Sequence, residues 1–461
     1  MTAIHFRIPL ALSLALALSL ALAMGLAEAD GFIDDSHATL ALRNFYFNQD
    51  NRDGHAGQTE EWGQGLRLDY QSGYTEGTVG VGLDAIGLLG IRLDGGGRAG
   101  KADQTRTPSA LFPLEHNARA RDEYSSLGLT AKLRVGASEA RVGTLIPRLP
   151  VIKANDGRLL PQTFEGAQLT VREFDDLTLL AGRLRQAKGR AQSHRDDLSI
   201  NGANSPRKPG NAVSPAPARH SDAFDFLGLD YQVSQQLQVQ YYLGQLEDFY
   251  RQHFLGLNHE QALPLGTLKT DLRHFDTRAT GHNASRSGRA EGYTAAGYYG
   301  PGNGESGAHR GKVDNRAWSA LFSWSLGAHS LGAGYQRLTG DSHFIQPNQG
   351  NGSDVYLITD RQLNSFARAG ERTWLAQYGV DFGTWGLPGL TSNVAYLKGS
   401  GIRSERGHLQ EWERDFTLAY VVQAGPAKGL GITWRNASLR SQASTDVDQN
   451  RVFLSYSLAL F

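Results

Sequence analysis

The last strand-like segment of the chain alternates between apolar and polar side chains. Its apolar residues fall on the even positions: Val452, Leu454, Tyr456, Leu458 and Leu460. Its odd positions carry Arg451, Ser455, Ser457 and Ala459, with Phe453 as the one large apolar exception. Successive side chains of a strand point to opposite faces, and an apolar outer face with a polar inner face is typical of a transmembrane β-barrel. A half-buried strand of a soluble sheet shows the same period, so the pattern constrains the fold only if it recurs.

The pattern does recur along the chain. Residues 30–461 allow about 24 residues for each of 18 strands with its connection, which suits membrane-spanning strands of about 10 residues joined by alternating short turns and longer loops. The same count is compatible with 16 to 20 strands. Polar insertions at 95–122, 188–222, 278–315 and 340–371 are expected to be surface loops. Strands are predicted at Thr39–Phe47, Gly63–Gln71, Gly77–Leu88, Leu127–Val135, Leu177–Arg185, Phe226–Tyr231, Leu237–Leu243, Trp318–Leu326, Ser330–Leu338, Trp374–Phe382, Asn393–Lys398, Phe416–Val422, Leu430–Leu439 and Val452–Leu460.

The amino-terminal segment predicts export. Arg7 precedes an almost wholly apolar stretch, residues 8–26, and Ala27-Glu28-Ala29 has the small-x-small form of a cleavage site. We therefore expect residues 1–29 to be a signal peptide and residues 30–461 to be one β-barrel domain; a retained transmembrane helix is the alternative. After residue 29 no apolar run approaches the roughly 20 residues that a spanning helix needs. A membrane-embedded mature chain must then cross as strands, and only a closed barrel satisfies their backbone amides.

Composition excludes several classes of protein. The chain has no cysteine, which rules out zinc–thiolate sites, cysteine nucleophiles and a disulfide-stapled secreted domain. Lys+Arg and Asp+Glu balance at 46 each, so no basic excess suggests nucleic-acid binding. The hydrophobic fraction of 40% is low for a soluble core of this length but expected of a barrel, where half of each strand faces water.

No motif in the chain predicts catalysis. Residues 95–100 fit G-x-G-x-x-G, but the residues that follow do not open the helix that a dinucleotide site requires. The nucleophile elbow G-x-S-x-G and the zinc motif H-E-x-x-H are both missing, and the 14 histidines scatter mostly through predicted loops. We therefore expect no enzyme activity, no cofactor and no metal site.

The predicted inner face is basic. An arginine facing lipid at mid-depth would cost roughly 2–4 kcal/mol, so basic residues on the strands should face the lumen, where they attract anions. Lumenal acids could instead pair with these cations; the candidates are Asp69, Glu411, Glu413 and Asp415. The basic strand residues that oppose apolar ones, and are therefore assigned to the lumen, are Arg43, Arg67, Lys132, Arg134, Arg183, Arg435 and Arg451.

Long ordered motifs over nearly the whole mature chain make it similar to one family, the OprD-type outer-membrane porins of pseudomonads. The motifs lie at Gly31–Ser36, Leu42–Asn48, Asp156–Thr163, Leu246–Gln252, Ala333–Gln336, Gly386–Thr391 and Ala419–Pro426. The resemblance implies an all-β fold: an antiparallel transmembrane barrel of about 18 strands, narrowed by inward-folded loops. It also implies passive, selective diffusion of small water-soluble carboxylates across the bacterial outer membrane, in contact with lipid and lipopolysaccharide.

The resemblance further implies a ladder of basic side chains that guides a carboxylate past an acidic pocket on a long loop. Arg435 and Arg451 resemble ladder positions, and Arg158 lies in the segment that resembles the constricting loop. Some members carry Arg where this chain has Thr433, and Lys where it has Ala419.

The acidic loop of the family resembles the stretch 360–366, with Asp360 as the candidate acid. Leu363 and Ser365 stand where members that take basic amino acids carry Tyr and Asp. This departure favours aromatic or other monocarboxylic acids as substrates, with basic amino acids or small peptides as the alternative. An unspecific sieve, or a secreted soluble β-protein such as a binding module or a hydrolase, are the remaining alternatives. The barrel could be a monomer or a loose homotrimer.

Overall fold

The fold is a closed antiparallel barrel, as predicted. The computed structural model describes residues 30–52, 58–99, 106–108, 110–200, 219–300, 309–347 and 354–461; the expected signal peptide, 1–29, lies outside them. In these ranges each long strand pairs with its neighbours along the chain, and β22 pairs with β1 to close the wall. The eighteen long strands are β1 (His37–Asn51), β2 (Gln58–Gln71), β3 (Val79–Asp94), β5 (Glu123–Val135), β6 (Ser138–Leu145), β9 (Thr163–Phe174), β10 (Leu177–Lys188), β12 (Phe224–Ser234), β13 (Leu237–Leu246), β14 (Tyr250–Leu263), β15 (Gly266–Ala279), β16 (Asp314–Leu326), β17 (His329–Gly340), β18 (Arg372–Asp381), β19 (Leu390–Ser404), β20 (Gly407–Val421), β21 (Gly431–Ser441) and β22 (Val447–Ala459).

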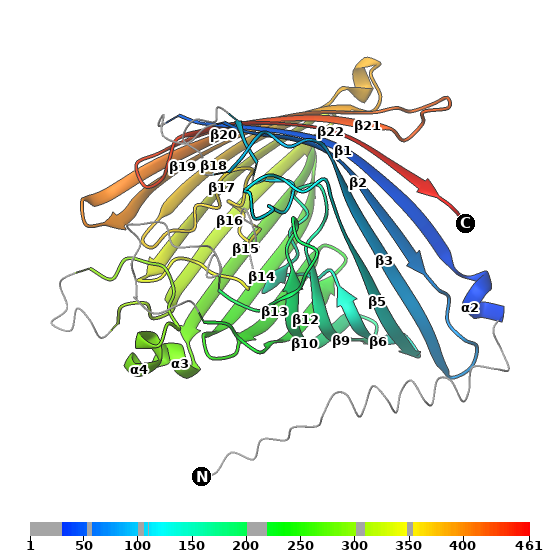
Figure 1. The fold of residues 1–461 in the computed structure, drawn as a ribbon, viewed down its shortest axis with the longest axis horizontal. Helices are drawn as coiled ribbons and strands as arrows, with labels where there is room; N and C mark the ends of the chain where they lie inside the picture. Colours follow the sequence, from blue (N-terminus) through cyan, green and yellow to red (C-terminus); the bar gives the residue numbers. More distant parts are fainter. Residues whose placement is uncertain are drawn as a thin grey trace, which may run out of the picture.

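Short helices and strands lie between the long strands, and the helices mark the two ends of the barrel. Helix α2 (Asp30–Asp34) and the carboxy-terminus lie at one end, and α3 (Gly281–Ala284) and α4 (Arg286–Ala290) lie at the other (Figure 1). We call these the turn end and the loop end. The remaining elements are β4 (Arg106–Thr107), β7 (Arg148–Leu149), β8 (Ile152–Lys153), β11 (Asp196–Asp197) and the 3₁₀ turn η1 (Phe382–Trp385). The helices of the described residues are all too short and too polar to span a membrane.

Large apolar side chains cover the outside of the barrel in two aromatic bands. Toward the loop end, Trp318 and Trp374 are 58% and 67% exposed, and Trp62 is also exposed. Toward the turn end, the exposed aromatic residues include Tyr378, Trp385, Tyr420 and Phe461, with leucines and valines between the two bands. Aromatic girdles that flank an apolar band are the outer surface of a membrane barrel.

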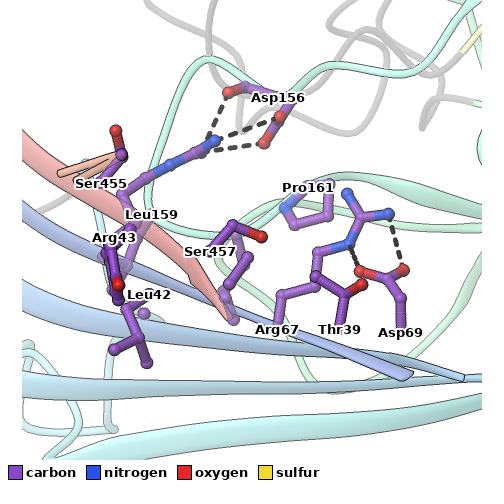
Figure 2. Close-up of a pocket in the computed structure, with 15 residues that line it drawn as sticks. Thr39, Leu42, Arg43, Arg67, Asp69, Asp156, Leu159, Pro161, Ser455 and Ser457 are labelled. Atoms are coloured by element: carbon purple, nitrogen blue, oxygen red, sulfur yellow. Dashed lines mark hydrogen bonds and ion pairs between the residues drawn. The ribbon is translucent and has the colours of Figure 1, made fainter. Parts of the chain in front are cut away.

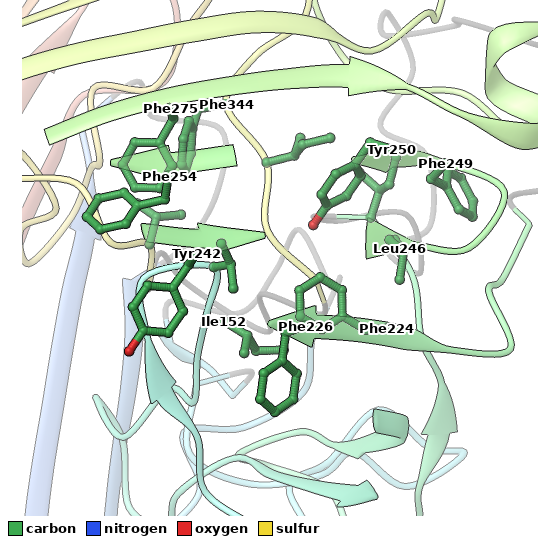
Figure 3. Close-up of a cluster of buried hydrophobic side chains, with 14 of the residues drawn as sticks. Ile152, Phe224, Phe226, Tyr242, Leu246, Phe249, Tyr250, Phe254, Phe275 and Phe344 are labelled. Atoms are coloured by element: carbon green, nitrogen blue, oxygen red, sulfur yellow. The ribbon is translucent and has the colours of Figure 1, made fainter. Parts of the chain in front are cut away.

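Several connections pack described residues against the inner wall of the barrel, and two of them, 146–162 and 341–371, meet the wall beside the pore. Val151 and Ile152, from the connection 146–162, join one buried cluster with Phe224 and Tyr250 of the wall (Figure 3). The connection 341–371 adds Phe344, whose ring lies 5.0 Å from that of Phe275. Burial of these apolar side chains holds both loops in the lumen, because fully burying one large apolar side chain contributes about 1.5–3 kcal/mol.

Glycine on the inner face of β2 makes room for the connection between β3 and β5 and for the connection 146–162. A Cβ atom on Gly63 would lie 2.6 Å from the ring of Phe112, and one on Gly65 would lie 2.8 Å from the carbonyl oxygen of Leu159. Part of the high glycine content therefore reflects close approach of the loops to the wall rather than turns alone.

The predicted orientation of β10 is wrong. Leu180 and Leu184 were expected on the lipid side, but both are buried in the lumenal cluster, while Arg183 is exposed on the outside of the barrel. Arg183 Nε donates to Asp225 on the neighbouring strand at 2.5 Å. The lumen of this half of the barrel is packed with apolar loop residues, so the leucines face inward, and the polar pair faces outward at the loop end, where the cost of exposing charge to lipid falls toward zero.

Candidate functional site: a basic constriction between two inward-folded loops

A cavity of about 470 Å³ lies where the two inward-folded loops meet the inner wall. We call it the constriction cavity. Its walls come from the connections 146–162 and 341–371 and from β19 to β22. Its charged lining residues are Arg158, Arg190, Arg361, Arg435 and Arg451, together with Asp354, Asp360 and Asp415.

Arg451 joins both loops to the final strand. It is 6% exposed, and its Nη2 donates to the carbonyl oxygen of Gln362 at 2.8 Å. Its Nη1 lies 3.4 Å from the carbonyl oxygen of Gly157. Arg435 lies directly opposite Arg451 on β21 and stacks over the ring of Phe453 at 5.3 Å. Two like charges placed opposite each other across strands repel, so this pair favours an anion in the cavity.

Arg158 and Arg190 have N–H groups without a hydrogen-bond partner. The structure leaves Nε and Nη1 of Arg158, and Nε and Nη2 of Arg190, buried and unsatisfied within the part of the chain that it describes. Arg158 lies over the ring of Phe47 at 4.5 Å. Burial lowers the pKa of Arg158 to about 10, and burial together with Arg158 lowers the pKa of Arg190. An arginine side chain stays protonated, so these desolvated cations with free donors suit a planar acceptor such as a carboxylate.

The acidic side of the cavity is partly neutralised. Lys153 forms an ion pair with Asp354, and its Nζ lies 4.0 Å from Asp360 Oδ2. Asp360 also accepts a hydrogen bond from the backbone N–H of Val355 at 3.1 Å. Burial and the neighbouring carboxylate of Asp354 raise the pKa of Asp360 to about 8. At neutral pH Asp360 is therefore mostly protonated, and the cations dominate the potential of the cavity.

Carboxylates on β20 position the tip of the loop 341–371. Glu413 is fully buried and accepts the backbone N–H of Leu363 at 2.8 Å, and Glu411 accepts the side-chain amide of Asn364 at 2.5 Å. These acids were candidates to pair with lumenal arginines. Glu411 forms an ion pair with Arg368 of the same loop, with Nε 3.7 Å from Oε2, so these contacts hold the loop that shapes the cavity.

A second cavity, of about 390 Å³, lies along the inner wall, nearer to the turn end. Arg43 Nη1 lies 2.9 Å from Asp156 Oδ1, and Arg67 pairs with Asp69 at 2.7 Å (Figure 2). Arg43 Nη1 also donates to the carbonyl oxygen of Arg158 at 2.6 Å. Both arginines therefore line the lumen but already have acidic partners. The basic side chains thus follow β22 and β1 from the constriction cavity to this wall cavity.

Comparison with known proteins agrees with this geometry. Residues 30–460 match the family model described as outer membrane porin, OprD family. The chain belongs to the OprD family of outer membrane porins. Family and fold are those of channels rather than enzymes, and they place this porin in the bacterial outer membrane.

Several relatives resemble this porin over almost their whole length. The crystal structure of Pseudomonas aeruginosa OccK8 (OprE) is 52% identical with a TM-score of 0.84, and the similarity covers 94% of this chain and 100% of that one. The structure of P. aeruginosa OpdK with vanillate is 36% identical with a TM-score of 0.79, covering 93% and 100% of the two chains. The porin-like protein GalP of Pseudomonas putida is 35% identical over 437 residues, which is 94% of each chain.

Besides Arg183, two more of the predicted ladder residues of this porin lie away from both cavities. Lys132 is buried inside the barrel near the turn end, where its Nζ lies 2.7 Å from Asp84 and donates to the carbonyl oxygen of Ser72 at 2.6 Å. Arg134 is exposed at the same mouth and stacks over the ring of Tyr74 at 4.3 Å. The structure therefore brings together Arg158, Arg435, Arg451 and Asp360 in one cavity and Arg43 and Arg67 in the next, and separates Lys132, Arg134 and Arg183 from them.

Three charged residues of the constriction cavity were not predicted. Arg190 follows β10 at the start of a long insertion, and Asp354 and Arg361 lie in the loop 341–371. Loop residues carry no periodic signal that shows where they point, so only their nearness to Asp360 could have suggested the last two. No cluster of three or more potential metal ligands occurs in the described ranges.

Proposed function

We propose that this porin conducts small carboxylate-bearing nutrients across the outer membrane passively and selectively. The observation that carries the proposal is the constriction cavity, in which buried arginine N–H groups without partners face a space of about 470 Å³. Five arginines and three aspartates line it, and one of the aspartates has a pKa raised to about 8. A basic constriction attracts anions and retards cations.

The form of the cavity supports a carboxylate rather than a basic amino acid. Lys153 already pairs with Asp354, and the pKa of Asp360 is raised to about 8, so these two acids offer little free charge to a cationic side chain. The solved relative OpdK was crystallised with vanillate, an aromatic carboxylate, which supports this substrate class for a chain with the same fold. Aromatic and other monocarboxylic acids are therefore the first compounds to test. A monomer suffices for the pore because each chain closes its own barrel, and a loose homotrimer is compatible with the same arrangement.

The test is single-channel recording in a planar bilayer with matched solutes. Benzoate and vanillate should reduce the channel current in a saturable way, whereas benzamide, which lacks the charge, should not. Arginine is included to test the alternative of basic amino-acid uptake. Equal effects of benzoate and benzamide would point to an unspecific sieve, and a channel blocked by arginine but not by benzoate would contradict the proposal.

A further inference from the structure

Three cations face outward on adjacent strands near the loop end. Arg337, Arg372 and Lys398 lie on β17, β18 and β19 and are all exposed. Arg337 is the direct cross-strand partner of Arg372, and Lys398 is the partner of Trp374, two residues along β18 from Arg372. The three side chains therefore form one patch on the outer face of the sheet. We call it the outer basic patch.

The outer basic patch has no acidic partner in the part of the chain that the structure describes. None of its three cations forms an ion pair with an acid in the described residues, and Arg337 and Arg372 oppose each other directly. Two other outward-facing arginines at this end have acidic partners: Arg183 pairs with Asp225, and Arg278 with both Asp276 and Asp314. Arg251 and Arg414 instead donate hydrogen bonds to neutral side chains, Gln245 and Asn436. Like charges in direct opposition destabilise a sheet, so this arrangement favours an external anion.

Aromatic side chains fix the depth of the patch in the membrane. Trp318 is the cross-strand partner of Arg337, and Trp374 is the partner of Lys398. Both tryptophans belong to the exposed aromatic band toward the loop end. Such bands lie at the level of the lipid head groups. Long loops of outer-membrane barrels face the cell exterior and short turns face the periplasm, so the patch meets the outer leaflet.

We propose that the outer basic patch binds the phosphorylated head group of lipopolysaccharide, through the phosphates of its lipid A. The two arginine forks can each donate two hydrogen bonds to a phosphate, and the Lys398 ammonium supplies a point charge beside them. The neighbouring tryptophans and the apolar band below them receive the acyl chains. This site faces away from the pore, so it is independent of the proposed transport of carboxylates.

The experiment measures lipid retention by the full-length mature porin in detergent, using native mass spectrometry. The probes are bisphosphorylated lipid A, dephosphorylated lipid A and phosphatidylglycerol. We expect preferential binding of the bisphosphorylated lipid. The triple variant R337Q/R372Q/K398Q should bind it on the order of 100-fold more weakly, because each basic side chain at an anionic lipid surface contributes about a fivefold gain in affinity.

A charge-matched triple variant, R183Q/R251Q/R278Q, is the control, because it loses three outward-facing cations elsewhere on the same end of the barrel. It should retain lipid A as the unchanged protein does. Single-channel conductance reports folding of both variants and should be unaltered in each. Equal loss of lipid A in the two triple variants, or equal binding of phosphorylated and dephosphorylated lipid A, would overturn the proposal. Equally tight binding of phosphatidylglycerol would assign the patch to anionic lipids in general and overturn the assignment to lipid A.

Discussion

Arg451 combines a charge in the pore with a tether for both loops, and the two contributions can be separated. Replacement by glutamine removes the charge and the hydrogen bond to Gln362, which is 2.8 Å long. A hydrogen bond from a charged donor contributes about 1.5–3 kcal/mol, so the loop 341–371 should leave its position 10-fold or more often. The variant also loses the attraction between the Arg451 charge and a carboxylate 4 Å away. That attraction is about 1 kcal/mol in bulk water and about 4 kcal/mol near a protein surface.

Arg435 supplies the matched comparison. It lines the same cavity directly opposite Arg451, and no hydrogen bond joins its side chain to the described part of either loop. Arg435→Gln and Arg451→Gln should therefore reduce anion selectivity by similar amounts, measured as the reversal potential in a salt gradient. Only Arg451→Gln should increase the current noise of the open channel. Equal noise in the two variants, or a quiet Arg451→Gln channel, would refute the tether.

Three further predictions concern other charged residues. Asp360 is neutral below its pKa of about 8 and ionised above it. The anion selectivity of the channel, measured as the reversal potential, should therefore fall as the pH rises from 7 to 9. Asp360→Asn should abolish this change. Lys132→Met should leave conductance and selectivity unchanged. It should reduce the free energy of unfolding, measured by denaturant titration, by about 3–5 kcal/mol, because the buried Asp84 carboxylate loses its lysine partner. An altered reversal potential would contradict this structural role. Arg183→Gln should not shift the reversal potential, because Arg183 faces away from the lumen; a shift would place it in the ion path.

The wall of the barrel is predictable where the lumen is open. In β22 and β1, the outward residues away from the ends are apolar except Asn44, so alternation correctly places Arg451 and Arg43 on the inner face. All fourteen predicted strands exist, and a count of 18 falls within the predicted range. The inward-folded loops were predicted from the family resemblance alone, because the periodicity of the strands carries no information about the loops.

The same reasoning fails where a loop fills the lumen. In β14, Tyr250 and Phe254 point inward to pack on the loop residues, while Arg251 and His253 point outward near the loop end. The strand therefore lacks the apolar-outside pattern, and neither it nor β15 was predicted. Arg183 was placed in the lumen for the same reason. Arg190, in an insertion, had no pattern at all. The polarity of a strand side chain depends on what lies on its side of the wall. Beside the inward-folded loops, the inner side contacts protein rather than water.

Strand β22 is both the seam of the barrel and the strand that anchors the loops. It pairs with β1 along thirteen residues, and its Arg451 contacts the connections 146–162 and 341–371. During assembly, a chain whose seam is still open would have neither a sealed wall nor a seated constriction. Pairing of β22 with β1 thus completes both the wall and the constriction. A barrel in which these strands are still unpaired would leak without discriminating among solutes.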